Sequence, residues 1–452
     1  MADIQQSPIA AVLATASATG IALHLFFFKI VEVDKRPVST AAAFIAAYPL
    51  IFITLPSISD EYNGIFWRLF ISSLTWSCLV ISLFSSILIY RAFFHPLKGF
   101  PGPFNARLSK FWSLKKVVDS KLRWWKILDR LHEQYGDYVR TGPRELVIFD
   151  PAALTPVLGF ASITGKGPFY DSMETSVNTS RDKEFHRKRR KIWDNAFKKS
   201  LSDYGPRIEE FTGQLIERIE KNDGKPILLN EICIHYSYDV MSALAFGDPM
   251  GFLKGDSNDV ANSVLDNIQK GVDAIGLLLH VPWLMGTLTT FSWAIGPMRQ
   301  WNEYSEQLVV LRKEMKNPKP DLFGHLLDNT EDTATGRALL NSECRLIVGA
   351  GRALDERNFV LANDFLPERW YSKPELTINK TAHMPFLIGP FNCAGRNLAM
   401  MELRSVVARV VHEFDVSFPK GVEFDAVNYF DRVKDHFIAG APKQDMVFTK
   451  RK

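Results

Sequence analysis

The amino-acid sequence predicts a mainly α-helical domain with minor β-structure behind an N-terminal membrane anchor. Three long apolar runs lie in the first part of the 452-residue chain. Amphipathic helical segments fill most of the remainder, and one short pair of strands is indicated. The length allows a large single domain or two smaller ones, with enough apolar residues for a sizeable core.

The membrane anchor is predicted from the apolar runs Ile9–Phe28, Ala41–Ile58 and Leu69–Tyr90. Each approaches the roughly 20 residues that a membrane-spanning helix needs. A secretory signal peptide has a shorter apolar part, so the runs indicate anchors rather than a cleaved leader. Pro49 and Pro56 interrupt the second run, which leaves open that one run lies in the membrane interface instead.

The loops between these runs alternate in charge. The first loop, KIVEVDKRP, is basic; the second, SDEY, is acidic; and basic residues follow the third run. Positively charged loops stay on the cytosolic side of a membrane. The pattern predicts a lumenal N-terminus, an anchor of about three transmembrane helices in residues 1–94, and a cytosolic domain in residues 95–452.

Net charge and cysteine spacing exclude several other classes of protein. A net charge of +4 is too small to indicate a polyanionic partner by itself. The four cysteines match neither a zinc spacing nor a CxxC pair, which argues against a disulfide or zinc framework and favours a reducing compartment. They are Cys78, Cys233, Cys344 and Cys393.

The sequence predicts local structure for two segments after the anchor. The proline-rich segment HPLKGFPGPFNARL predicts a stiff elbow between the anchor and the domain, because proline fixes the backbone angle. Further on, RIEEFTGQLIERIEKNDG has the spacing of an amphipathic helix. Four of its apolar residues share one face: Ile208, Phe211, Leu215 and Ile219.

Two other segments carry weaker signals. YVRTGPRELVIFD predicts two strands joined by a turn at Gly142-Pro143. The apolar stretch Gly276–Pro297 is long enough for a fourth span, but it contains His280 and Pro282. We therefore expect an interfacial or channel-lining loop, with its tryptophans at the level of the lipid headgroups.

One cysteine has an unusual setting. In PFLIGPFNCAGRNLAMMELR, Cys393 stands between Gly389 and Gly395, just before a segment with helical spacing. Glycines let a backbone approach a flat partner closely, and a helix N-terminus favours the thiolate form of a nearby cysteine. A thiolate is a haem-iron ligand that promotes O–O cleavage. A lone cysteine is by default a buried structural residue, so this spacing needs further support.

The spacing around Cys393 resembles the haem loop of the cytochrome P450 family, Phe-x-x-Gly-x-Arg/His-x-Cys-x-Gly. The chain has Phe386, Gly389, Cys393 and Gly395 at matching positions and departs at Phe391, where a possible haem-propionate partner is lost. The resemblance implies a cytochrome P450 fold and heme b, which is iron protoporphyrin IX, with Cys393 as the axial iron ligand. The pattern is similar to that of fungal microsomal members of secondary metabolism.

The resemblance extends over most of the chain. NDFLPERWY is similar to the Pro-Glu-Arg-Trp segment of the family, in which Arg369 would belong to a structural Glu-Arg-Arg triad. HPLKGFPGP resembles the hinge after the membrane anchor. HRKRRKIWDNAF resembles helix C, with His186-x-x-x-Arg190 in place of Trp-x-x-x-Arg. This match implies that Arg190, and more weakly His186, contacts a haem propionate.

Five consecutive basic residues, Arg187 to Lys191, lie in the segment that resembles helix C. Such a run indicates a solvated face, a nucleic-acid patch or a docking surface. In a P450-like fold this face lies on the proximal side, where an acidic reductase docks, and electrostatic steering speeds such encounters. The membrane anchor argues against nucleic acid as a partner.

Two elements of the family are missing from the sequence. After LNSECRLIVGAG, the positions of the helix I acid and threonine hold Ala353 and Leu354, which cannot relay a proton. The one Glu-x-x-Arg spacing, Glu184 to Arg187, lies far upstream of where helix K belongs. The family pattern resumes cleanly afterwards, which predicts an internal deletion near 351–352, from the end of helix I through helix K. We expect such a deletion to remove the ion partners of Arg369 and to expose apolar faces that packed on the lost helices.

The resemblance implies a membrane-bound haem-thiolate monooxygenase that oxidises an apolar small molecule, in secondary-metabolite biosynthesis. Electrons would come from NADPH–cytochrome P450 reductase, and the chain would be a multi-pass protein of the endoplasmic reticulum membrane with its haem domain facing the cytosol. With the acid and threonine absent, no catalytic side chain is assigned.

Two rival classes stay open. The missing elements favour a truncated, catalytically inactive P450-derived membrane protein. An integral-membrane transporter is disfavoured, because the apolar spans cluster at one end of the chain.

Overall fold

The structure is a computed structural model that describes residues 8–58, 64–291, 296–316, 321–346, 367–378, 383–436 and 439–452. The chain forms two compact units. The first comprises Met1–Lys116, Leu128–Phe149 and His280–Phe291, and the second comprises Val117–Ile127, Asp150–Leu279 and Ser292–Lys452. The first unit therefore includes more than the anchor predicted for residues 1–94. The boundary between a membrane anchor and a haem domain after residue 94 remains a prediction.

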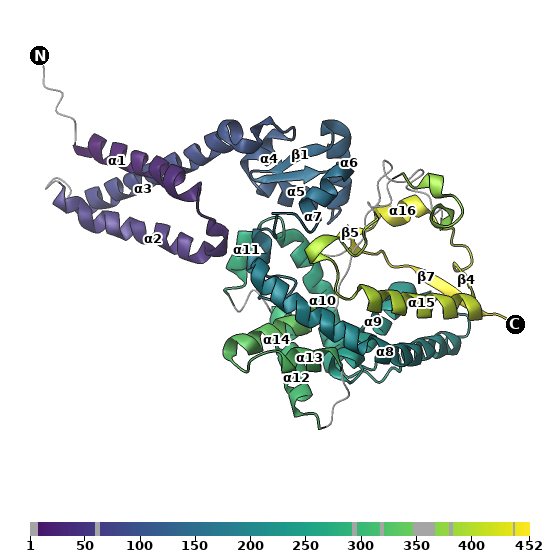
Figure 1. The fold of residues 1–452 in the computed structure, drawn as a ribbon. Coiled ribbons are helices and arrows are strands. Elements are labelled where there is room, and N and C mark those ends of the chain that lie inside the picture. Colours follow the sequence, from purple (N-terminus) through teal and green to yellow (C-terminus); the bar gives the residue numbers. More distant parts are fainter. Residues whose placement is uncertain are drawn as a thin grey trace, which may run out of the picture. The chain divides into compact units, whose positions relative to one another are not determined.

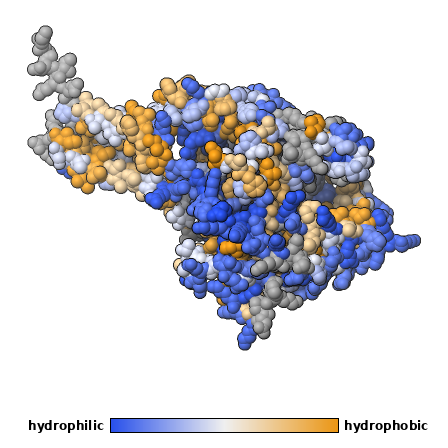
Figure 2. Space-filling view, viewed as in Figure 1, coloured by the Kyte–Doolittle hydropathy of each residue, from blue (hydrophilic) through white to orange (hydrophobic). Residues whose placement is uncertain are grey.

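Three apolar helices of the first unit are long enough to cross a membrane (Figure 1). They are α1 (Pro8–Leu23), α2 (Pro37–Thr54) and α3 (Ile65–Ile89), and with the turns that extend them the candidate spans run over Pro8–Phe28, Pro37–Ser57 and Ile65–Phe94. Hydrophobic residues gather on their surface in Figure 2. No further helix of this kind occurs among the described residues. The predicted runs are thus helical, including the second, where Pro49 lies inside α2.

Small residues let α1 pack closely along α3. Ala16 and Gly20, one turn apart on α1, are buried against α3. A Cβ atom on Gly20 would overlap the hydroxyl of Ser82 and the carbonyl oxygen of Leu79. Membrane helices have no hydrophobic driving force between them, and close approach of backbones replaces it. The close contact therefore holds α1 against α3 as a packed pair of helices, and α2 also packs against α3.

The rest of the first unit consists of short elements. They are α4 (Phe104–Leu108), α5 (Phe111–Asp119), α6 (Trp124–Tyr135), β1 (Tyr138–Gly142), β2 (Glu145–Ile148) and α11 (Pro282–Leu288). Two of them, α5 and α6, are divided between the first and the second unit. β1 and β2 pair in antiparallel register across the turn that the sequence predicts. The elbow is held to β1, since the N–H of Arg140 donates to the carbonyl of Pro101 at 2.8 Å.

The second unit contains most of the helices. They are α7 (Leu154–Leu158), α8 (Lys183–Lys221), α9 (Leu229–Phe246), α10 (Asp259–Leu278), α12 (Gly296–Glu314), α13 (Leu322–Asp328), α14 (Ala334–Leu346), α15 (Arg396–Glu413) and α16 (Ala426–Asp431). A three-stranded antiparallel sheet has the order β3 (Ile227–Leu228), β7 (Asp445–Lys450), β4 (Phe414–Ser417), and β5 (Lys434–Asp435) pairs with β6 (Ala439–Gly440).

The main core of the second unit lies where α8, α9 and α15 meet the three-stranded sheet. The four apolar residues predicted to share one helix face are all buried there, so the amphipathic reading of this segment is confirmed. Leu398 of α15 and Phe414 of β4 pack into the same cluster. The core therefore fixes α15, and with it the loop that precedes α15.

Candidate functional site

The loop that carries Cys393 is shaped by Gly389. This residue is buried and has φ +72°, and a Cβ atom there would overlap the carbonyl oxygen of Leu158. The N–H of Cys393 donates to the carbonyl of Phe386 at 2.8 Å, which closes the loop. A residue with a side chain at position 389 would be strained and would also clash, so this glycine is required by the fold itself.

Cys393 is exposed and stands directly ahead of a helix. Gly395 is the N-cap of α15, which begins at Arg396 as the sequence predicts. A Cβ atom on Gly395 would meet Phe197 at 3.7 Å and the sulfur of Cys393 at 3.9 Å, which are ordinary contacts. The described residues thus explain Gly389 sterically, whereas the role predicted for Gly395 and Phe386 against a flat cofactor remains a prediction.

Arg190 is brought to the cysteine loop from α8. Its Nη1 donates to the carbonyl of Asn392, and its Nη2 donates to the Oδ1 atom of Asn392 at 2.7 Å. Its Nε donates to Asp194 at 2.7 Å. The guanidinium therefore fixes the residue next to Cys393. The sequence predicted contact of Arg190 with a haem propionate, and it did not identify Asn392 as the partner that the structure shows.

His186 lies on the same side of the loop, four residues before Arg190. Its ring centroid is 4.7 Å from that of Phe391, and its side chain is buried. Burial, with the nearby charges of Lys166 and Arg190, lowers the pKa of His186 to about 4. The imidazole is therefore neutral at pH 7, and it can offer an anion a hydrogen bond but no charge.

The five-residue basic run divides between surface and core. Arg187 and Lys188 are exposed and pair with Glu184, so the one Glu-x-x-Arg spacing of the chain forms a local surface ion pair. Arg189 is buried, and its Nη2 lies 2.6 Å from a carboxylate oxygen of Glu343 on α14. A docking face formed by the whole run is therefore too broad a reading, because Arg189 belongs to the interior.

Several predicted features lie at or beyond the limit of the described residues. The positions of the missing helix I pair, Ala353 and Leu354, and the predicted junction near 351–352 lie outside them. Arg369 is described: it is buried, and its Nη1 lies 3.5 Å from the carbonyl oxygen of Leu376.

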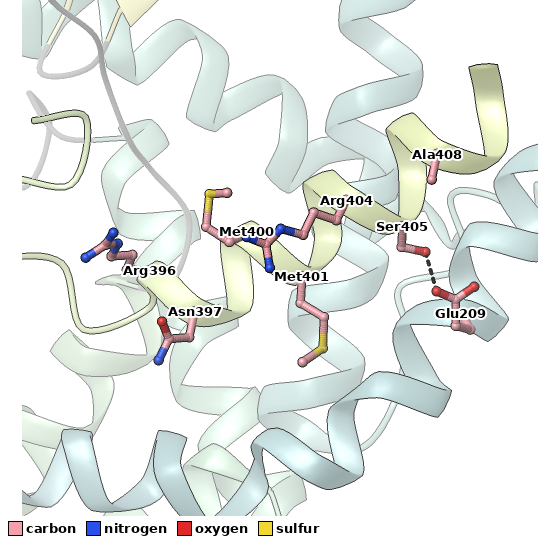
Figure 3. Close-up of a pocket in the computed structure, with 8 residues that line it drawn as sticks. All are labelled: Glu209, Arg396, Asn397, Met400, Met401, Arg404, Ser405 and Ala408. Carbon is pink, nitrogen blue, oxygen red and sulfur yellow. Dashed lines mark hydrogen bonds between the residues drawn. The ribbon is translucent and has the colours of Figure 1, made fainter. Parts of the chain in front are cut away.

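A cavity of about 630 Å³ opens along α15, on the side that faces α8 (Figure 3). Met400, Met401 and Arg404 of α15 line it, together with Glu209 of α8, which accepts a hydrogen bond from Ser405 at 2.7 Å. None of the predicted site residues lines this cavity. It is therefore separate from the cysteine loop, although both are built on the same helix.

The residues around Cys393 fit a haem on the side of the axial ligand. They supply an exposed thiol on a glycine loop, a helix N-terminus directly behind it, and one basic side chain of α8, Arg190, bonded to the residue that precedes it. A thiolate is a haem ligand, and cations suit carboxylate groups at the rim of the macrocycle. The positions that correspond to helix I of the family lie outside the described residues.

The chain is thus a helical protein with candidate membrane spans and a cysteine loop suited to haem ligation. The cytochrome P450 family model matches residues 101–351 and 330–430. The chain belongs to the cytochrome P450 family, whose members bind haem, receive electrons from a redox partner and oxidise small molecules.

The similar proteins are fungal cytochrome P450 monooxygenases. Monooxygenase FCK2 of Fusarium pseudograminearum is 28% identical over 96% of this chain and 96% of its own length. Monooxygenase orf5 of Eupenicillium brefeldianum is 30% identical over 82% of this chain and 95% of its own. Tryprostatin B 6-hydroxylase of Aspergillus fumigatus is 27% identical over 97% and 96%. The resemblance to fungal P450 enzymes of secondary metabolism is confirmed.

Proposed function

We propose that this chain is a membrane-bound haem-thiolate monooxygenase with heme b as cofactor, Cys393 as the axial iron ligand and an apolar small molecule as substrate. The observation that carries the proposal is the loop from Phe386 to Gly395, which presents an exposed thiol at the N-terminus of α15. A haem bound there supplies the activation of molecular oxygen, with electrons from NADPH by way of cytochrome P450 reductase.

The protein's own residues position this thiol. Gly389 allows the turn, the hydrogen bond from Cys393 N–H to Phe386 closes it, and Arg190 holds Asn392 from the side of α8. Because these contacts are made by backbone groups and by a charged side chain, the backbone that carries the sulfur is held in place before any cofactor binds. This preorganisation is what a metal ligand needs from its protein.

The first unit supports an anchor that leaves the haem domain in the cytosol. Asp34, in the basic loop between the first two spans, forms an ion pair with Arg144 at the turn of the β-hairpin. The loop after the first span and the hairpin after the third therefore lie on one side of the membrane, which is the arrangement that three spans require. Basic loops favour the cytosolic side, which supports a cytosolic haem domain. The similarity to fungal microsomal enzymes supports the endoplasmic reticulum as the membrane. Protease added to sealed microsomes should digest the haem domain without detergent, and protection of that domain would contradict this orientation.

The apolar stretch around α11 suits a lipophilic substrate. α11 packs against α2 and against the turn at Val33–Lys35, within the same unit, and its Trp283 is partly exposed. Tryptophan favours the membrane interface. The sequence predicts a loop here, whereas the structure forms the short helix α11. We infer that this segment lies at the membrane surface and that substrates reach the protein from the bilayer.

We also propose that the chain lacks a segment that its relatives have. Two observations on the alignments support this. The alignment with FCK2 runs to 537 positions although the chain has 452 residues, so at least 85 positions hold no residue of this chain. The two matches to the family model overlap at residues 330–351, so their continuity breaks close to the predicted junction.

A third observation comes from α15. Leu403, Val407 and Val411, spaced four residues apart, form an apolar stripe on α15 with 55%, 56% and 54% of their surfaces exposed. The opposite side of α15 packs into the core through Leu398. A helix that is apolar on two sides is typical of one that packs between two neighbours. If a segment that once packed on this side of α15 were lost, an exposed apolar stripe of this kind would remain.

The stripe can be tested by substitution. We expect Val407→Gln, alone or with Leu403→Gln, to change the melting temperature little and to reduce aggregation, because an exposed glutamine costs a helix nothing in propensity or burial. The matched control is Leu398→Gln, which places an amide in the core and should destabilise the protein strongly. A large loss of stability in Val407→Gln would mean that the stripe is covered, and would contradict the proposed deletion.

The proposed function is tested by the difference spectrum of the reduced, carbon-monoxide-bound protein, with the chain expressed as written in microsomes. A Soret band of the thiolate type supports the monooxygenase. Absence of haem, or a band of a haem that has lost its thiolate, would instead favour the catalytically inactive membrane protein, which the missing helix I acid and threonine support.

A further inference from the structure

The position where this chain departs from the family's haem-loop pattern has an unusual neighbour. Phe391 stands where the pattern has a basic residue, two positions before Cys393. The ammonium group of Lys166, from the loop that follows α7, lies 4.8 Å from the centre of the Phe391 ring. A cation over an aromatic face is attracted by the ring quadrupole, so Phe391 and Lys166 form a cation–π contact.

The backbone of Lys166 is fixed independently of this contact. Arg181 donates from Nε to the carbonyl of Lys166 at 2.9 Å and pairs with Asp171. The Lys166 ammonium also lies 5.6 Å from the ring of Tyr170 and 3.3 Å from the carbonyl oxygen of Val177. The side chain is therefore directed into an aromatic cradle beside the cysteine loop, and it does not extend into solvent as surface lysines do.

In the part of the chain that the structure describes, this cation has no anion of its own. Among the described residues, no carboxylate lies within ion-pair distance of Lys166. Burial lowers the pKa of its ammonium to about 8, as expected for a cation that is partly removed from water without a partner. An unpaired, half-buried charge is costly unless a ligand of opposite charge completes it.

The other basic groups at this place are less free to bind an anion. The guanidinium of Arg190 donates to Asn392 and to Asp194, and the imidazole of His186 is neutral at pH 7. Arg190 and Lys166 flank His186 closely enough that both charges lower its pKa. Of the described basic residues around Phe391, Lys166 is thus the charge that remains available.

We propose that Lys166, in cation–π contact with the ring of Phe391, binds a haem propionate. It would replace the basic residue that the haem loop lacks at position 391. This inference rests on the proposed function, since it needs haem on Cys393. The expectation from the sequence that Arg190 and His186 contact a propionate remains a prediction; this inference adds Lys166, while Arg190 orders the loop through Asn392.

The test measures haem affinity rather than activity. The full chain in detergent micelles is titrated with ferric protohaem and, separately, with its dimethyl ester, in which both propionates are uncharged. We expect Lys166→Met to weaken binding of protohaem on the order of tenfold, as for the loss of one charged hydrogen bond. Binding of the dimethyl ester should be the same in Lys166→Met and the wild type, and Lys166→Arg should retain most of the affinity for protohaem.

The control is Lys191→Met, an exposed lysine on α8 that should affect neither ligand. Equal weakening of both ligands in Lys166→Met would show that the lysine only supports the loop, and no weakening of either would show that it does not contact the propionate. Either result overturns the inference and leaves the haem assignment standing. If the wild type binds no haem, the proposed function fails and this inference fails with it.

Discussion

Cys393→Ser is expected to abolish the thiolate-type Soret band of the reduced, carbon-monoxide-bound protein and to lower monooxygenase turnover on the order of 100-fold or more. The reason is chemical: a serine hydroxyl stays protonated at neutral pH and does not donate the electron density that promotes O–O cleavage. Loss of an outer partner of a metal ligand already costs 10–100-fold, so loss of the ligand itself should cost at least that much.

The substitution is conservative for the fold, which makes the result interpretable. The loop is closed by the backbone N–H of Cys393, and this bond to Phe386 remains when sulfur becomes oxygen. Cys233→Ser is the matched control, since this thiol is also exposed but lies on α9, away from the loop. An unchanged spectrum in Cys393→Ser would remove the ligand assignment, whatever haem the protein binds.

The parts of the structure that the sequence predicted well are those set by local pattern. The three apolar runs are helical, the Gly142-Pro143 turn joins a β-hairpin, and the segment after Cys393 forms α15. Each depends on residues that are close in the chain: a long apolar run, a turn pair, and a helix that begins after a glycine. Such signals survive without knowledge of the tertiary structure.

The basic run shows where local reasoning was incomplete. Arg189 was counted with its neighbours as part of one charged face, but a helix places only every third or fourth residue on the same side. Arg189, Trp193 and Ala196 share that spacing, and all three are buried. The apolar residues at 193 and 196 were the available signal that residue 189 faces the core.

Two contacts around the cysteine loop could not have been predicted from local sequence pattern. Lys166 and Phe391 are 225 positions apart in the printed sequence, and Arg190 and Asn392 are separated by 202. Their contacts depend on how the loop after α7 and the helix α8 pack against the cysteine loop. A family pattern supplies positions for expected partners, but it cannot show which side chain takes over when one position changes.

A buried ion pair fixes the helix that carries Arg190 and His186. Arg189 of α8 and Glu343 of α14 expose 5% and 0% of their side chains, and two further atoms, the carbonyl of Asn329 and the hydroxyl of Thr330, accept from Arg189. All three nitrogens of the guanidinium thus have partners. Such a pair offsets the cost of burying its charges only while both partners are present.

Glu343→Gln is therefore expected to destabilise the protein by about 3–5 kcal/mol, because it leaves the guanidinium of Arg189 buried without its counter-charge. The double variant Arg189→Met/Glu343→Met should recover much of that loss, since it removes both charges and fills similar space with apolar atoms. Glu184→Gln, which breaks the exposed pair with Arg187, is the control and should change little. Thermal unfolding of the four proteins in detergent provides the measurement. If Glu343→Gln melts like the wild type, the ion pair does not hold α8 against α14. If the double variant is as unstable as Glu343→Gln, the loss comes from packing at residue 343 and not from the uncompensated charge of Arg189.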